Sequence, residues 1–366
     1  MSPTTPKKLP RIPKRLPLGG LAIGSVWMLA FHPFSAPPSD PPPPESLPNF
    51  TWGIAWHPDR LQQHGQAYHT ELSAAEKLGV GLLRFDVRWS HLHPQEGSVD
   101  DTVLPYFQEL IRDARAKGFQ VKVNLGSYPR WSLDLLKRDP EAFFMRYQAY
   151  VQEVVTALGP TVDYYQMGNE FNTVLDPIPA ELDARIFKTA RVEIDHGKER
   201  WPRWEVRTVI NACDTFYLPW RGHIESVLDE ASDSIDVIGY DFYPGNYSHL
   251  HDWGAWHTLG YLSSLMERYD KDGAICETGC PAFLGEDRQA RWISVSTRSL
   301  LRAIAASPMR DRFRFAALYE LSDDPHPTYL WPPPTEATFG LMAADGRMKA
   351  GFEAFRGVIA ERGAQR

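Results

Sequence analysis

From residue 50 onward, short apolar runs alternate with longer segments in which apolar residues recur every three or four positions. The short runs are typical of strands buried on both faces, and the longer segments of helices that bury one face. The predicted strands span residues 50–56, 81–87, 119–125, 162–167, 206–212, 235–240, 274–276 and 313–318. The predicted helices span residues 68–78, 103–117, 140–158, 180–198, 220–231, 256–269, 287–306 and 348–360.

These elements form eight strand-then-helix units with no strand left over. Such alternation is typical of parallel strands, and eight of them can close into a barrel. An open doubly wound sheet is the alternative. It favours a Gly-rich phosphate loop after the first strand, where Trp56-His57-Pro58 stands instead. We therefore predict an α/β fold, a single (β/α)8 TIM barrel over residues 50–366.

The first 49 residues have a different composition. Five basic residues precede an uncharged apolar run over residues 18–31, and a Pro-rich tract follows over residues 32–49. The run is shorter than the roughly 20 residues of a membrane span and fits a signal peptide, but no clean small-x-small cleavage site follows. We predict a signal peptide or uncleaved membrane anchor over residues 1–31 and a linker over residues 32–49. The barrel would then be periplasmic, extracellular or membrane-anchored through this segment only.

The charge distribution argues against a nucleic-acid partner. The formal net charge is −7, of which the first fifteen residues contribute +5, so the rest of the chain carries about −12. Phosphate binding favours a basic surface instead. The chain also contains 12 Trp, 15 Tyr and 18 Phe. We expect most of them in the core, but flat aromatic faces also line sugar-binding clefts, so this composition is compatible with a carbohydrate ligand.

The three cysteines do not indicate a metal site. Cys276 and Cys280 are close enough in sequence to form a disulfide, whereas Cys213 ends another apolar run. At least one thiol stays unpaired in a monomer, which is the state we expect. No pair of Cys or His residues stands beside them at zinc-like spacing. We therefore predict neither a metal nor a cofactor.

Two glutamates follow predicted strands whose C-terminal ends would share one mouth of the barrel. Glu170 follows the fourth strand and Glu277 the seventh, and in such barrels the active site lies at these strand ends. A buried carboxylate costs on the order of several kcal/mol unless it is partnered, so a pair of them suggests catalysis. Glycoside cleavage needs such a pair, one carboxyl to protonate the leaving oxygen and one carboxylate to attack the sugar or activate water.

Further motifs occur in the order found in a known family. They are Leu83-Arg84-Phe85-Asp86-Val87-Arg88-Trp89, Pro94-Gln95-Glu96-Gly97, Tyr128-Pro129-Arg130-Trp131, Asn169-Glu170, the stretch 236–244, Glu277, and Phe339-Gly340-Leu341-Met342 with Asp345-Gly346 and Lys349. Together they span about residues 50–355 and resemble clan A of the glycoside hydrolases, which are retaining enzymes with (β/α)8 barrels.

The resemblance implies a role for each matching residue. Glu170 would be the general acid/base and Glu277 the nucleophile of a β-glycosidase that acts on a poly- or oligosaccharide by double displacement. Asn169 would bind the sugar 2-hydroxyl, Arg84 would favour the ionised form of Glu277, and Tyr243 would orient Glu277. The remaining predicted substrate-binding residues are His57, Trp131, Trp331 and Tyr319.

One position departs from the clan pattern. Many members carry a Trp at the end of strand eight, whereas this chain has Ala317-Leu318-Tyr319-Glu320-Leu321. Tyr319 or Trp331 would have to supply the missing ring. This departure keeps open a second hypothesis, a catalytically inactive carbohydrate-binding barrel displayed at the cell surface. A metal-dependent barrel isomerase or lyase is a third. The sequence does not define the sugar, the linkage, or endo versus exo action.

Overall fold

A computed structural model describes residues 47–172, 178–213, 220–246, 253–324 and 333–363, which all lie in one compact unit, residues 37–366. The strands are β1 Thr51–Ala55, β2 Leu82–Arg88, β3 Gln120–Gly126, β4 Tyr164–Met167, β5 Arg207–Cys213, β6 Val237–Asp241, β7 Asp272–Thr278 and β8 Phe313–Leu318. The α-helices are α2 Pro58–Gln63, α3 His69–Leu78, α4 Trp89–Leu92, α5 Val103–Ala116, α6 Arg130–Arg138, α7 Pro140–Leu158, α8 Ala180–Arg200, α9 Trp220–Ala231, α10 Thr258–Tyr269, α11 Glu286–Ala305, α12 Pro333–Glu336 and α13 Ala350–Gly363. Short 3-10 helices are η1 Gly159–Thr161, η2 Ser232–Ser234, η3 Ala282–Leu284 and η4 Arg310–Arg312.

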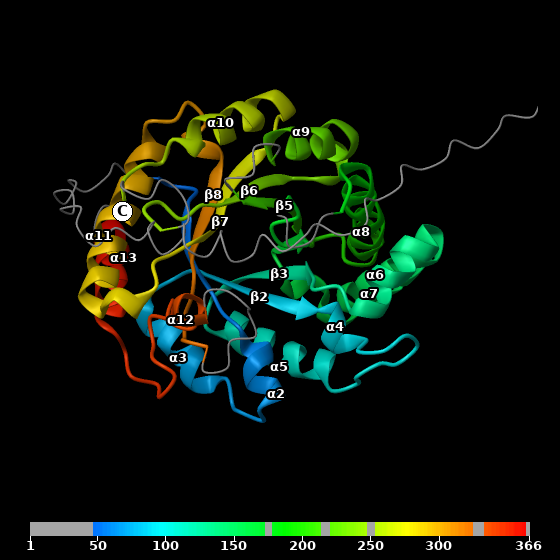
Figure 1. The fold of residues 1–366 in the computed structure, drawn as a ribbon, viewed down its shortest axis with the longest axis horizontal. Coiled ribbons are helices and arrows are strands. Elements are labelled where there is room, and N and C mark those ends of the chain that lie inside the picture. Colours follow the sequence, from blue (N-terminus) through cyan, green and yellow to red (C-terminus); the bar gives the residue numbers. More distant parts are fainter. Residues whose placement is uncertain (1–46, 173–177, 214–219, 247–252, 325–332, 364–366) are drawn as a thin grey trace, which may run out of the picture. The chain divides into compact units, whose positions relative to one another are not determined.

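The strands of the described residues form a closed parallel barrel in the order β1 to β8, with β8 pairing back onto β1. Figure 1 shows the strands at the centre and the helices around them. The predicted eight-stranded α/β barrel is therefore confirmed. Because every strand runs in the same direction, all strand C-terminal ends meet at one mouth.

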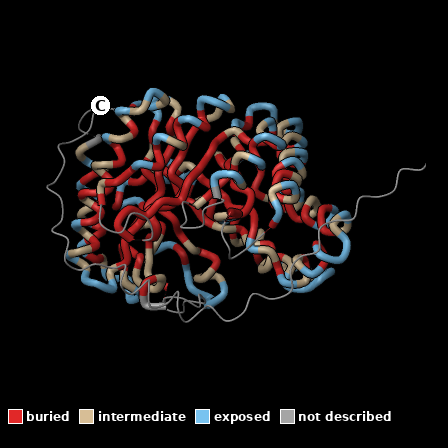
Figure 2. The backbone as a smooth tube through the Cα atoms, turned by 45° about the horizontal axis from the view of Figure 1, so that its top comes forward, coloured by how far each residue is buried: buried red, intermediate tan, exposed pale blue. Residues whose placement is uncertain are grey.

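The inside of the barrel has an apolar layer followed by a polar one. A cluster of buried residues separate from the main core contains Leu82, Tyr164, Val209, Val237, Ala274, Cys276 and Phe315, from six strands. Side chains alternate along a strand, so residues two positions further on also face inward. On β2, β4 and β5 these residues are the buried Arg84, Gln166 and Asn211. Figure 2 shows the strands as the buried centre of the structure.

Some elements differ from the sequence prediction. Strand β7 begins at Asp272, two residues before the predicted start, because that carboxylate is paired with Arg207, Arg312 and Arg314 and so can occupy a strand end. The helices α2, α4 and α6 lie in the connections after strands and were not predicted. Their runs of 6, 4 and 9 residues are too short to give a clear helical period.

The predictions for the N-terminal region remain predictions. The segment over residues 1–31 and nearly all of the linker over residues 32–49 lie outside the described residues. Among the helices that the structure describes, none has the length and apolar character needed to span a membrane.

Cys213, Cys276 and Cys280 all lie in the described part of the chain and all carry free thiols. The disulfide that the spacing of Cys276 and Cys280 would permit does not form. Cys276 faces the barrel interior, whereas the Cys280 thiol contacts Asn246 and Arg288.

Gly239 on β6 tests how tightly the barrel interior is packed. A methyl group there would overlap the Cys276 sulfur and lie 2.9 Å from the backbone oxygen of Ile210. We expect Gly239→Ala to lower the free energy of unfolding by about 1–3 kcal/mol, as overpacking does. Gly260 in α10 has open space around it, so Gly260→Ala should instead raise the stability by about 0.5–1 kcal/mol. Urea denaturation of both variants measures the two effects, and equal stabilities would contradict the predicted packing.

Candidate active site

Glu277 is the sixth of the seven residues of β7 and is almost completely buried. Its carboxylate forms an ion pair with the Arg84 guanidinium, and the Tyr243 hydroxyl donates a hydrogen bond of 2.6 Å to Oε2. Its backbone oxygen accepts from the amide of Phe242 at 3.0 Å, which joins β7 to the end of β6. Glu277 thus lies within the strand rather than in the following loop, and it has the partners that a buried carboxylate requires.

Glu170 lies three residues beyond β4 in a strained turn. Its φ is +46°, after Gly168 at +75°, and the left-handed region costs a non-glycine residue about 1–2 kcal/mol. Its amide donates to Oδ1 of Asn211 at 2.8 Å, which holds the turn against β5. Strained residues persist where the surrounding structure holds them and cluster at functional sites, which agrees with a specific role for this side chain.

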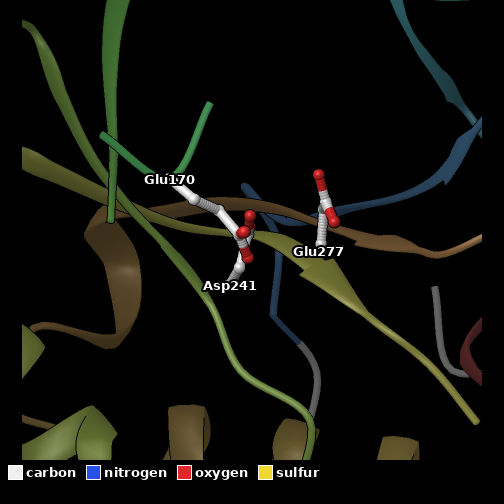
Figure 3. Close-up of side chains that lie close together, drawn as sticks. All are labelled: Glu170, Asp241 and Glu277. Carbon is white, nitrogen blue, oxygen red and sulfur yellow. The ribbon is translucent and has the colours of Figure 1, made fainter. Parts of the chain in front are cut away.

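The two glutamates meet at the mouth of the barrel together with Asp241, the last residue of β6. One carboxylate oxygen from each of the three lies within 4.8 Å of the others. Figure 3 shows the side chains of Glu170 and Asp241 converging, with Glu277 beside them. Residues from β6, β7 and the end of β4, far apart in the sequence, thus form one acidic centre.

Arg84 connects this centre to Asn169. The same guanidinium nitrogen that pairs with Glu277 donates to Oδ1 of Asn169 at 2.8 Å, and Nε2 of Gln166 donates to that oxygen at 3.1 Å. Below them, the buried ammonium of Lys122 donates to Oε1 of Gln166. Asn169 itself is exposed. The polar layer of the barrel therefore orients the side chains that border the mouth.

The environment of the site raises the pKa values of two of the three carboxyls. Burial and the neighbouring charge of Glu277 raise the pKa of Glu170 to about 7, although a hydrogen bond from the Cys213 thiol opposes the shift. Burial, followed by the charges of Glu277 and Glu170, raises the pKa of Asp241 well above its usual value. Among the described residues, the Arg84 guanidinium is the one that forms an ion pair with a member of the cluster.

The structure places the other predicted site residues in different surroundings. Tyr319, just after β8, packs edge-on against Tyr243 and His57, with ring centroids 6.5 and 5.7 Å apart. Nε2 of His57 lies 3.1 Å from Oε2 of Glu320. Trp131 lies in α6, where its indole donates to the backbone oxygen of His93 at 3.0 Å. Trp331 lies outside the described residues.

Asn211 and Cys213 were not predicted as contributors to the site, and the position of Asp241 at the end of the sixth strand placed it at the mouth without a defined role. Asn211 and Cys213 lie on β5, for which no catalytic signal was apparent, and contact Glu170 from the side. Asp241 precedes Tyr243 by two residues and could equally be read as a turn-forming residue. The period of two along β6 from Val237 is the signal that would have placed Asp241 inside the barrel.

The spacing of the three carboxyls would also suit a divalent cation. The contact between Arg84 and Glu277 provides a positive charge at the same place, which is a different way to compensate a buried carboxylate. The donor set is therefore also consistent with a metal-free acidic centre.

A polar hollow of about 570 Å³ lies at the opposite end of the barrel. Its lining includes the first residues of several strands, among them Thr51, Gln120 and Tyr164. The two arginines there, Arg207 and Arg314, are both paired with Asp272. We assign no catalytic role to this hollow, because the titratable centre lies at the other end.

Comparisons with known proteins identify the fold. No protein-family model matches the chain, and no curated protein matches it in sequence. Among solved structures, an exo-β-1,4-mannosidase from Opitutaceae bacterium strain TAV5 is 17% identical with a TM-score of 0.66, covering 90% of this chain and 63% of that one. The chain therefore spans less than two thirds of the length of that mannosidase.

Two further structures are similar. GH5_18 from Streptomyces cattleya, solved in complex with GlcNAc, is 16% identical with a TM-score of 0.67, covering 88% of this chain and 82% of that one. A family 39 glycoside hydrolase from Bacteroides cellulosilyticus WH2 is 15% identical with a TM-score of 0.60, covering 85% and 63%. The predicted resemblance to (β/α)8-barrel glycoside hydrolases is thus confirmed at the level of the fold.

The raised pKa of Glu170 predicts a cost to stability. The folded protein holds a proton that the unfolded chain releases near pH 4.5, so stability falls as the pH rises from about 4.5 to about 7. We expect Glu170→Gln to be more stable than the wild type by about 1–3 kcal/mol at pH 8, and by less at pH 5. Urea denaturation at both pH values measures this difference. The exposed Glu199 gives the control variant Glu199→Gln, and the same gain for both variants would contradict the prediction.

Proposed function

We propose that this protein is a retaining β-glycosidase in which Glu170 is the general acid/base and Glu277 is the nucleophile. The observation that carries the proposal is the approach of the two carboxyls to within 4.8 Å at the mouth of a (β/α)8 barrel. The similarity of the fold to several glycoside hydrolases supports the proposal further.

The short separation favours retention over inversion. The two carboxyl groups of retaining enzymes are about 5–5.5 Å apart, whereas inverting enzymes leave about 6.5–9.5 Å for a water molecule. With oxygens of Glu170 and Glu277 this close, little room remains for water between the base and the sugar.

In the first step, Glu170 would donate its proton to the glycosidic oxygen while a carboxylate oxygen of Glu277 attacks the anomeric carbon. The bond to the leaving group breaks, and an ester bond between the sugar and Glu277 forms. Arg84 and Tyr243 hold Glu277 through an ion pair and a hydrogen bond, so the nucleophile is oriented before substrate binds.

In the second step, Glu170, now ionised, would take a proton from water, and the water oxygen would attack the anomeric carbon. The ester bond breaks and Glu277 leaves as a carboxylate. Because the ester carries no charge, the repulsion that raises the pKa of Glu170 is weaker in the intermediate, which suits its change from acid to base.

The substrate is proposed as a carbohydrate with a β-linkage. Oδ1 of Asn169 is used by Arg84 and Gln166, so its amide nitrogen is the group directed to the sugar 2-hydroxyl. His57, Trp131, Trp331 and Tyr319 remain the predicted sugar contacts. Manβ1-4GlcNAc and other β-mannosides belong in the first substrate panel. One protein of similar fold is named an exo-β-1,4-mannosidase, and another was solved in complex with Manβ1-4GlcNAc. Export, with or without an N-terminal anchor, also remains a proposal.

Replacing each glutamate separately tests the assignment. Glu277→Gln should lower kcat on aryl β-glycosides by at least about 10⁴-fold, because the covalent step is lost. Glu170→Ala should lose most activity on natural glycosides but regain it with azide on activated aryl glycosides, giving a β-glycosyl azide. Product analysis by NMR measures both the rate and the configuration.

Each outcome separates the proposal from its alternatives. An α-configured azide or an unchanged rate in both variants would contradict the assigned roles. Binding of a glycan in calorimetry without any product from the wild type would favour the inactive carbohydrate-binding barrel. Glu199→Gln serves as the active control, because this residue is exposed and far along α8.

The pH profile provides an independent prediction. Glu170 must be protonated to act as the acid, so kcat/KM should fall as the pH rises through about 7. The loss should appear mainly with poor leaving groups, which need protonation, and much less with 2,4-dinitrophenyl glycosides. Measuring both substrates between pH 5 and 9 tests this. Equal alkaline losses for the two substrates would exclude Glu170 as the acid.

A further inference from the structure

Asp241 has no role in the reaction described above, yet it lies at its centre. It is the last residue of β6, its side chain is completely buried, and it is the third member of the carboxyl cluster. Figure 3 shows its carboxyl group directed toward that of Glu170. A third buried carboxyl beside two others is costly, so its presence requires an explanation.

Only half of this carboxyl group has a hydrogen-bond partner. Oδ1 accepts from Nδ2 of Asn211 at 2.8 Å. Oδ2 is buried and has no hydrogen-bond partner among the described residues. Buried polar atoms are nearly always hydrogen-bonded, and each exception calls for an explanation, of which a role in catalysis is one.

Asn211 links Asp241 directly to the backbone of Glu170. Its Oδ1 accepts from the Glu170 amide at 2.8 Å, so its Nδ2 is the atom left to donate to Asp241. The two contacts fix the orientation of the amide, because a reversed amide would place donor against donor and acceptor against acceptor. Asp241 therefore helps to hold the strained turn that carries Glu170.

Several titratable and charged groups surround Asp241 and Glu170, and Glu336 of α12 also acts on Glu170. Three charged groups on neighbouring elements interact with Asp241. They are Glu170 after β4, Glu277 on β7 and the Arg84 guanidinium on β2. The Cys213 thiol on β5 and the Lys122 ammonium on β3 also interact with it electrostatically. Further groups affected by its charge are Cys276 and Tyr243. Two cations and three carboxyls share this space, and Arg84 is already paired with Glu277.

We propose that Asp241 is a positioning residue that controls the proton of Glu170, both through the Asn211 bridge and through direct charge coupling across the cluster. This inference rests on the proposed function and deepens it. Asp241 and Glu170 then lose their protons as a coupled pair rather than as two independent acids. The two carboxyls share a proton in the free enzyme. Asp241 retains that proton when Glu170 is ionised, because burial, and after it the charges of Glu277 and Glu170, raises the pKa of Asp241.

The test is a carboxyl titration that does not depend on activity. The full-length protein is labelled with [δ-¹³C]glutamate, and the Glu170 signal is assigned from its loss in Glu170→Gln. Asp241→Asn keeps an oxygen that can accept from Asn211 but removes the ionisable group. We expect the Glu170 midpoint in this variant to fall by about one pH unit or more, since coupled groups interact on that scale. The alkaline limb of kcat/KM should move down by the same amount.

Asp236→Asn is the matched control. Asp236 immediately precedes β6 at the opposite end of the barrel, where it accepts from Thr208 and Arg191. The Asp236→Asn substitution makes the same chemical change as Asp241→Asn, and we expect it to leave the titration midpoint of Glu170 unchanged. An unchanged midpoint in Asp241→Asn, or an equal shift in both variants, would overturn the proposal.

Two further outcomes are covered. If Asp241→Asn does not fold, the test is the carboxyl titration of wild-type protein labelled with both [δ-¹³C]glutamate and [γ-¹³C]aspartate. A two-step Glu170 curve that shares a step with an aspartate supports coupling, and a single-step curve overturns it. Should the wild type hydrolyse no glycoside, the proposed function fails, while the NMR titration still decides the role of Asp241.

Discussion

The contact between Arg84 and Glu277 is the interaction on which the site depends. It places one cation against the buried carboxylate of Glu277, and the same nitrogen also binds Asn169. A carboxylate this deeply buried is stable only with such compensation. Burial is the largest cause of the raised pKa values of Glu170 and Asp241, and the charge of Glu277 is the next.

The barrel makes this contact possible by separating two kinds of interior. At one end, apolar side chains from six strands fill the ring, and toward the mouth the same inward positions become Arg84, Lys122, Gln166 and Asn211. The apolar layer supplies stability that offsets the polar one. The parallel direction of the strands then brings residues more than a hundred positions apart in sequence to one opening.

The sequence predicted the strands and helices well, because their alternation reflects burial on both faces of a closed sheet. It also predicted that Glu170 and Glu277, at the ends of two apolar runs, would meet at one mouth of the barrel, as their carboxyls do. It assigned Asp241 no defined role and did not predict Asn211, because the alternation along a strand separates its two faces without showing which of them lines the barrel. The difference depends on which face of each strand closes the ring, and that is a property of the assembled barrel.

The loop residues were the hardest to place. Trp131 lies in an unpredicted helix, α6, and its indole donates to the backbone carbonyl of His93, just after α4. Tyr319 lies just after β8, and its ring packs edge-on against those of Tyr243 and Phe339. Side-chain contacts of this kind follow from the packing of neighbouring loops, for which local pattern carries little information.

The left-handed backbone at Glu170 has an evolutionary consequence. Glu170 occupies a backbone conformation that glycine and asparagine adopt at little cost. Its replacement would also remove the cost of burying its carboxyl beside the charge of Glu277. Selection for stability alone would therefore favour the replacement of this glutamate.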